Sequence, residues 1–245
     1  VVKSGAFAIM RLTYFCFGAY FIRGTWEHFA VISIAMISVI YGSTMEVKET
    51  HFKRRLAFST ISNLSYILLG VTMMSPLGLF AGISHLVIHA IMKIGAFFSA
   101  GAVLHQSNKE YIDELNGLGR KMPFVFTTFT ICGLSLIGIP LFAGFISKWN
   151  IAAAAMETGA EFPYAYVAVG VLLYSALMTA VYIMTVAIRA WFPDKGYNAK
   201  ANEGVKDPNW EMKLPLLLFM IAIIAIGLYS QPLMEIFQKV ANGII

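Results

Sequence analysis

Residues 77–104 read LGLFAGISHLVIHAIMKIGAFFSAGAVL, and this stretch decides the class of the fold. Lys93 is its only Asp, Glu, Lys or Arg, and the run is longer than the roughly 20 residues that a helix needs to cross a bilayer. Only helices and closed barrels satisfy their backbone groups in lipid, and the alternation of apolar and polar residues typical of barrel strands is missing here. The stretch therefore predicts a transmembrane helix that tilts or extends beyond the bilayer.

Six further charge-poor apolar stretches predict additional spans. They cover residues 1–22, 29–45, 56–74, 123–148, 164–188 and 214–233. The sequence thus predicts an all-α protein, a polytopic transmembrane helix bundle with about seven spans. Residues 232–245 place apolar side chains at helical spacing with polar ones between them, which predicts an amphipathic end on the membrane or on a neighbouring subunit.

The composition agrees with this class. The chain has 245 residues, of which 58% are hydrophobic and 13% are charged, whereas soluble domains carry about 25% charged residues. An aromatic content of 14% excludes intrinsic disorder, and the two cysteines, Cys16 and Cys132, lie in apolar runs and exclude a disulfide-rich secreted domain. The net charge of +5 reflects loop charge and is not evidence for nucleic-acid binding.

The positions of the basic residues predict the orientation. Loops 46–55, 105–122 and 189–213 hold 12 of the 18 Lys and Arg residues, while loops on the other side hold only Arg23 and Lys239. Basic residues concentrate in cytoplasmic loops, so these three loops are predicted to be cytoplasmic.

The remaining basic residues, Lys3, Arg11, Lys93 and Lys148, fall inside predicted spans. A charge at the bilayer centre costs at least about 2.5 kcal/mol, so such residues usually face a protein interior or a water-filled path. All 13 acidic residues are expected in loops or at span ends, which leaves the lysines without an internal carboxylate. We expect that the lysines are partly neutral, that the acids lie on a segment that precedes this chain, or both.

The most specific pattern is HLVIHAIMK, in which His85, His89 and Lys93 follow one another at intervals of four. This spacing places the three side chains in one stripe along an apolar helix. Histidine titrates near neutral pH, so the stripe favours a proton relay. Structural polar contacts and metal binding are the alternatives, and no Cys, Asp or third His lies nearby in sequence.

The segment GIPLFAGFISKW predicts a discontinuous helix. Pro140 removes a backbone donor, while Gly138 and Gly144 loosen the same turn. Broken helices at membrane depth line cavities, where their free carbonyls meet an ion or a protonated lysine. Lys148 follows the break, at the end of the span away from the cytoplasm, and is either a relay member or an interfacial lysine beside Trp149.

Two other groups are less specific. The span 56–74 carries Ser59, Ser62, Asn63 and Tyr66 on one face, a stripe typical of hydrogen bonding between helices and also compatible with transport. In the first span Arg11 lies close to the face of Lys3, as a relay member or as a side chain that reaches the interface.

Five segments in order resemble the antiporter-like proton-channel subunits shared by respiratory complex I, energy-converting membrane hydrogenases and Mrp-type cation/proton antiporters. These segments are VVKSGAFAIMRL, KRRLAFSTISNLSY, HLVIHAIMKIGAFFSAGAV, NGLGRKMP and GIPLFAGFISKW. The resemblance covers nearly the whole chain.

The resemblance implies two inverted five-helix repeats, each with a broken helix. Residues 1–28 would then be the last helix of a first repeat, and 29–188 the second proton-channel repeat. Residues 189–213 would be a cytoplasmic loop and 214–245 a C-terminal helix with an amphipathic end. The chain begins without Met inside an apolar segment, so we expect the first repeat to precede it.

The resemblance also implies roles for individual residues. Lys3 and Lys93 would be central proton carriers, His85 and His89 would connect them with water, and Lys148 would be the terminal lysine of the second half-channel. Some relatives have glutamate at that last place. Asn63, beside Ser62, stands where many relatives have His or Gln.

The sequence and the resemblance together predict a subunit that translocates protons, or exchanges them for sodium, in a prokaryotic plasma membrane. Its partners would be other membrane subunits of a respiratory, hydrogenase or antiporter complex. The sequence has no iron-sulfur cysteine cluster and no nucleotide-binding motif, so no cofactor is expected in this chain and any redox chemistry would belong to the complex. The alternatives are a secondary transporter of a small solute and a purely structural membrane subunit.

Overall fold

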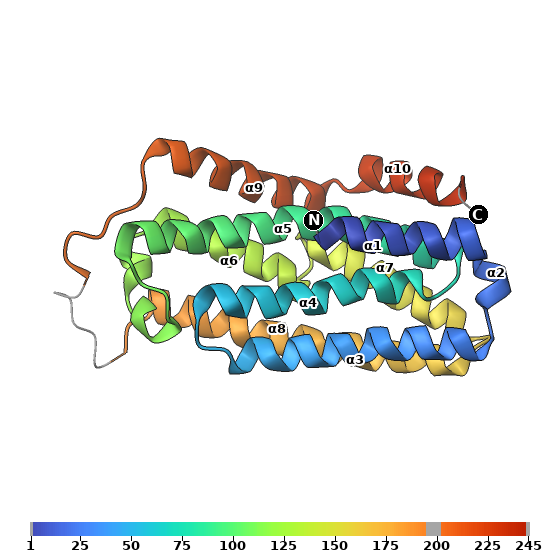
Figure 1. Ribbon diagram of the computed structural model, residues 1–245. Helices are drawn as coiled ribbons and strands as arrows, with labels where there is room; N and C mark the ends of the chain where they lie inside the picture. Colours follow the sequence, from blue (N-terminus) through green and yellow to red (C-terminus); the bar gives the residue numbers. More distant parts are fainter. Residues whose placement is uncertain (1, 195–201, 244–245) are drawn as a thin grey trace.

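The computed structural model describes residues 2–194 and 202–243. This part of the chain is all-helical (Figure 1). The α-helices are α1 Val2–Arg11, α2 Ala19–Ile22, α3 Trp26–Lys48, α4 Phe52–Val71, α5 Pro76–Ser107, α6 Pro123–Ile137, α7 Ala143–Gly159, α8 Tyr166–Trp191, α9 Trp210–Leu228 and α10 Gln231–Asn242. Four segments are long and apolar enough to cross a membrane, namely Trp26–Lys48, Pro76–Ser107, Pro163–Trp191 and Trp210–Leu228. The predicted all-α membrane fold is confirmed at this level.

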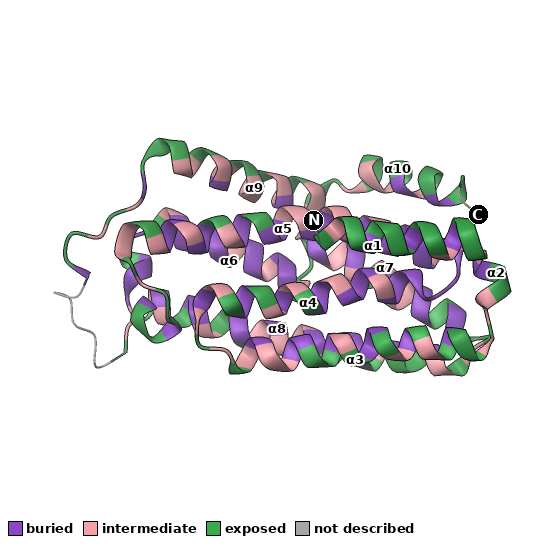
Figure 2. Ribbon diagram, in the orientation of Figure 1, coloured by how far each residue is buried: buried purple, intermediate pink, exposed green. Residues whose placement is uncertain are grey.

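Helix α5 lies at the centre of the bundle. It packs against α4, α6, α7, α9 and α10, while α3 packs against α4 and α8. Its start is fixed by Ser75, whose hydroxyl oxygen accepts a hydrogen bond from the Gly78 amide, and by Pro76 in the first turn. Buried residues continue along α4 and α5, whereas α1 is mostly exposed (Figure 2). The stripe that begins at His85 therefore lies on a helix with neighbours on most of its sides.

The three basic loops meet at one end of the bundle, as the alternation of spans requires. Backbone hydrogen bonds join the α3–α4 connection to the segment after α5, from Phe52 N to the Glu110 carbonyl and from Ile112 N to the Thr50 carbonyl. The Gly117 amide donates to the Arg189 carbonyl of α8. Amides of Glu110 and Tyr111 donate to the Glu114 carboxylate and hold its pKa below the usual value. Residues 195–201 of the predicted loop 189–213 lie outside the described residues.

The interruption predicted from Pro140 is present. Helix α6 ends at Ile137, Gly138 takes a left-handed conformation with φ 94°, and α7 starts at Ala143.

The prediction of one continuous span over 1–22 was wrong. A π-helical segment, Leu12–Phe17, follows α1, and Gly18 with φ 81° separates it from α2, because this backbone conformation cannot continue a right-handed helix. The predicted span 214–233 likewise divides after Leu228, and α10 follows.

The boundaries of the predicted loop 46–55 were also wrong. Helix α3 continues to Lys48 and α4 begins at Phe52, so Glu46 lies inside a helix. The Arg55 side chain stabilises the last turn of α3, which continues past the apolar part of that helix. Its Nε donates to the Glu46 carbonyl at 2.6 Å and its Nη2 to the Val47 carbonyl at 2.8 Å. These bonds satisfy carbonyls that the end of a helix leaves free.

A close approach of α3 to α4 depends on Gly42. A Cβ atom at this position would lie 2.7 Å from the Ser62 backbone nitrogen, so Gly42→Ala forces the two helices apart. We expect this substitution to lower the free energy of unfolding by about 1–3 kcal/mol, as overpacked cores do. Thermal unfolding of the purified protein measures it. Gly170→Ala on α8 is the control, since nothing lies within 4 Å of its added methyl group. Equal melting temperatures for the two variants would contradict the close packing.

Candidate functional site

The α5 stripe forms a buried row. His85 and His89 are fully buried and Lys93 is 3% exposed. The two imidazole rings are stacked, with centroids 5.7 Å apart and planes at 8°. His85 Nδ1 lies 2.9 Å from the Ser147 hydroxyl of α7, whereas no protein atom in the described residues hydrogen-bonds to either nitrogen of His89 or to Lys93 Nζ. The geometry thus brings together the three residues that the sequence singled out.

Lys148 closes one end of this row. Its Nζ donates to the carbonyl oxygens of Leu136 at 2.6 Å and Ile137 at 3.3 Å, the last two residues of α6. These are carbonyls that the broken helix leaves without an intrahelical partner. Lys148 Nζ also lies 4.9 Å from the centre of the Tyr66 ring. The ammonium group therefore occupies the break.

The predicted place of Lys148 at the far end of its span was wrong, and so was the alternative of an interfacial lysine. Because α6 stops at Ile137, Lys148 falls in the second turn of a new helix and its side chain reaches back into the bundle. Trp149 next to it is 64% exposed. Gly144 permits the close contact of α7 with α6, since a Cβ there would overlap the Ser135 carbonyl.

Helix α4 connects Lys148 with the histidines. The Tyr66 ring is fully buried and meets the His85 ring edge-on, with centroids 5.5 Å apart. Asn63 is also fully buried. Its Nδ2 donates to the Ser59 carbonyl, and its Oδ1 has no hydrogen-bond partner in the described part of the chain. Of the polar stripe on this helix, Tyr66 is the residue that contacts the row.

At the other end, Lys93 shares a pocket of about 330 Å³ with Lys3 of α1. The remaining lining residues are Val2, Thr60, Leu64, Ile94, Phe97 and Phe98. Lys3 is half-buried, and the Lys93 ammonium lies 5.9 Å from the centre of the Phe97 ring. The structure therefore places the two predicted central lysines beside one cavity.

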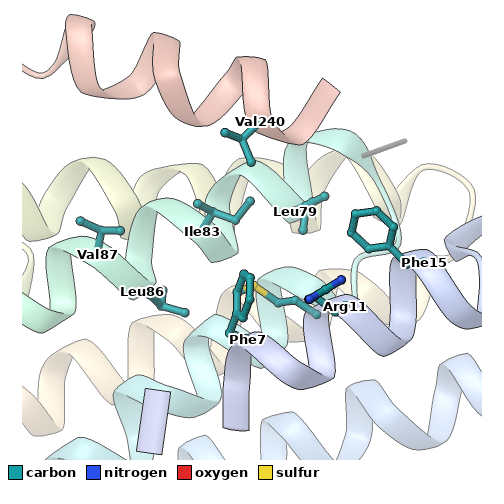
Figure 3. A pocket seen from close by; sticks show the side chains of 9 residues that line it. Phe7, Arg11, Phe15, Leu79, Ile83, Leu86, Val87 and Val240 are labelled. Carbon is teal, nitrogen blue, oxygen red and sulfur yellow. The ribbon is translucent and has the colours of Figure 1, made fainter. Parts of the chain in front are cut away.

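Arg11 lies apart from this row. It lines a different, apolar pocket of about 360 Å³, to which α1, α5 and α10 contribute (Figure 3). The α5 residues in this pocket, such as Leu79, Ile83 and Leu86, are not those of the histidine stripe. The guanidinium group lies 5.7 Å from the centre of the Phe15 ring, and the residue is exposed. Of the two alternatives for Arg11, the geometry favours the one outside the relay.

Glu46 is the residue that the sequence analysis missed. Glu46 lies in the last turn of α3, at a span end as expected, but the expectation that no carboxylate is enclosed in the bundle was wrong, because this one is fully buried between α3, α4 and α8. Thr179 donates to its Oε1 at 3.0 Å and Ser62 to its Oε2 at 3.4 Å. A signal was available, since Val39, Gly42, Ser43 and Glu46 repeat at helical spacing and are all buried.

Comparisons with known proteins agree on one group. Residues 1–179 match the family described as "NADH:quinone oxidoreductase/Mrp antiporter, TM". NADH-quinone oxidoreductase subunit N of Desulforudis audaxviator is 30% identical over 96% of this chain and 48% of its own length. The chain spans about half the length of the curated relatives it matches.

Solved structures show the same fold. A chain in the Mrp complex from Dietzia sp. DQ12-45-1b superposes with a TM-score of 0.85 at 24% identity, over 99% of this chain and 51% of that one. A chain of the membrane-bound sulfane sulfur reductase, an archaeal respiratory membrane complex, gives a TM-score of 0.83 at 28% identity, over 99% and 47%.

The contact between Ser147 and His85 provides a test of the row. Ser147→Ala removes the hydrogen bond at His85 Nδ1, and leaving a buried polar group unpaired costs about 1–3 kcal/mol. We expect a lower melting temperature for this variant. The control is Ser107→Ala near the end of α5, where the hydroxyl donates only to the Val103 carbonyl. If both variants melt like the unmodified protein, Ser147 does not hold the ring.

Proposed function

Because the chain belongs to the NADH:quinone oxidoreductase/Mrp antiporter family of transmembrane proteins, we propose that it translocates protons through its buried lysine and histidine row. The observation that carries the proposal is the stacking of His85 on His89 between two amines, the half-buried Lys148 beyond His85 and the buried Lys93 beyond His89. Imidazole and amine groups can gain and lose a proton. Protons would pass stepwise along Lys3, Lys93, His89, His85 and Lys148.

The lack of protein partners supports this role. Buried polar groups are nearly always hydrogen-bonded, and an unpaired one costs about 1–3 kcal/mol. Both His89 nitrogens, His85 Nε2 and Lys93 Nζ have none among the described residues. A row that only packed helices together would be expected to satisfy these atoms. Groups that exchange protons with water need nitrogen atoms that are not already hydrogen-bonded to the protein.

The break between α6 and α7 supports a proton path over a solute path. In broken-helix transporters the free carbonyls coordinate the transported ion or substrate. Here the last two carbonyls of α6 are taken by the Lys148 ammonium. The secondary transporter of a small solute thus becomes the weaker alternative. Exchange of protons for sodium is compatible with the same row, and a sodium-dependent rate would identify it.

The finer organisation is part of the proposal. Helices α3 to α8 supply five spans, with α6 and α7 as the broken one, in the region 29–188 assigned to the second inverted repeat. The shared loop end would face the cytoplasm of a prokaryotic plasma membrane. The partners would be other membrane subunits of a respiratory, hydrogenase or antiporter complex, and redox cofactors would be bound by those subunits.

Lys93→Ala tests the proposal. Removing the amine at the centre of the row should lower proton translocation about 100-fold or more, the usual effect of losing a group that transfers a proton. The measurement is proton uptake by inverted vesicles that contain the assembled complex, whose assembly is checked by copurification of its subunits.

The control is Lys239→Ala, an exposed lysine on α10. It removes the same charge far from the row in sequence and should leave uptake unchanged. If Lys93→Met and His89→Leu translocate protons at the normal rate, the purely structural alternative is correct and the relay is not.

A further inference from the structure

The polar surroundings of Glu46 continue beyond its two direct hydrogen bonds. Ser59 of α4 pairs with Tyr182 of α8 at 2.8 Å, and Ser43 of α3 pairs with Ser175 of α8. These four residues are buried, and their hydroxyl groups both donate and accept. A carboxylate and a set of hydroxyls therefore line the interface of three helices next to the row.

The carboxylate has no ion pair in the described residues. Arg55 is close in sequence, but its Nε and Nη2 are directed at the carbonyls of Glu46 and Val47. A buried carboxylate without a partner in contact is costly when ionised, by several kcal/mol. Its proton occupancy therefore depends on whatever positive charges lie within reach.

Those charges are the lysines of the row. Helix α4 lies between them and Glu46: its Ser62 hydroxyl donates to the Glu46 carboxylate, and its Thr60 and Leu64 line the pocket that Lys93 shares with Lys3. A proton on Lys93 stabilises ionised Glu46, and a neutral Lys93 favours protonated Glu46. The two groups are thus arranged to share a proton.

We propose that Glu46 is a proton-carrying carboxylate that exchanges a proton with Lys93 and connects the row to the α3–α8 interface. In the step, the O–H bond of the neutral carboxyl breaks and an N–H bond forms on the neutral amine, through intervening water or hydroxyls. A neutral pair becomes an ion pair and the total charge is unchanged. This inference rests on the proposed relay and adds a branch to it.

Gly42 supports the arrangement from one turn earlier on α3. Its missing side chain lets α4 approach, so that the Ser62 hydroxyl reaches the Glu46 carboxylate. Thr179 reaches it from α8. Side chains of two helices, α4 and α8, therefore donate hydrogen bonds to one carboxylate and fix its position at the interface.

Glu46→Gln in the assembled complex tests the inference. Glutamine keeps the shape and accepts a hydrogen bond but carries no exchangeable acid proton, so a structural role would survive the change. We expect proton uptake by inverted vesicles to fall about tenfold or more, as expected when a proton-transfer group is lost. Glu46→Asp should restore most of the rate. Glu157→Gln, an exposed acid on α7, is the control and should leave it unchanged.

Infrared difference spectroscopy supplies an independent readout. The C=O band of a protonated carboxyl should disappear in Glu46→Gln and change in intensity in Lys93→Met. If Glu46→Gln takes up protons at the normal rate while Lys93→Ala does not, the role of Glu46 is wrong and the proposed function stands. If Lys93→Ala takes up protons normally, both the relay and the exchange partner of Glu46 are wrong. A carboxyl band unaffected by either variant would also overturn the inference.

Discussion

The cost of burying ionisable groups in an apolar bundle is the constraint on which the rest of the structure depends. Lys93, Lys148, His85, His89 and Glu46 all lie among helices whose other side chains are largely apolar. Each such group is expensive unless something compensates it. The compensation differs from group to group, and these differences explain where helices break and how closely they approach.

The break between α6 and α7 is the most direct compensation. A helix that stops inside the bundle leaves carbonyl groups without a hydrogen-bond partner, and an ammonium group needs acceptors. Lys148 therefore donates to the carbonyl oxygens of Leu136 and Ile137, and both needs are met. Gly138 and Gly144 make the turn and the close contact possible. Glu46 is compensated by the hydroxyls of Ser62 and Thr179 that contact it.

Much of this was predictable from sequence, and the errors have physical reasons. The apolar runs, the Pro140 break and the His85, His89, Lys93 stripe follow from local periodicity, and the family resemblance seen in five motifs is confirmed. The hydropathy pattern placed the end of the second predicted span at Met45, because hydropathy does not reveal that Arg55 caps α3 beyond that residue. Glu46 was missed for that reason. The inward direction of Lys148 depends on where α7 begins, which is set by tertiary packing.

The central claim is that protons pass through two amines of the row, those of Lys93 and Lys148. Counting the protons moved per catalytic turnover by the assembled complex tests it most directly, with the native chain compared against the double variant Lys93→Met/Lys148→Met. The account predicts a lower count for the double variant, because its path through this chain is closed. An unchanged count in a complex that turns over normally would contradict it.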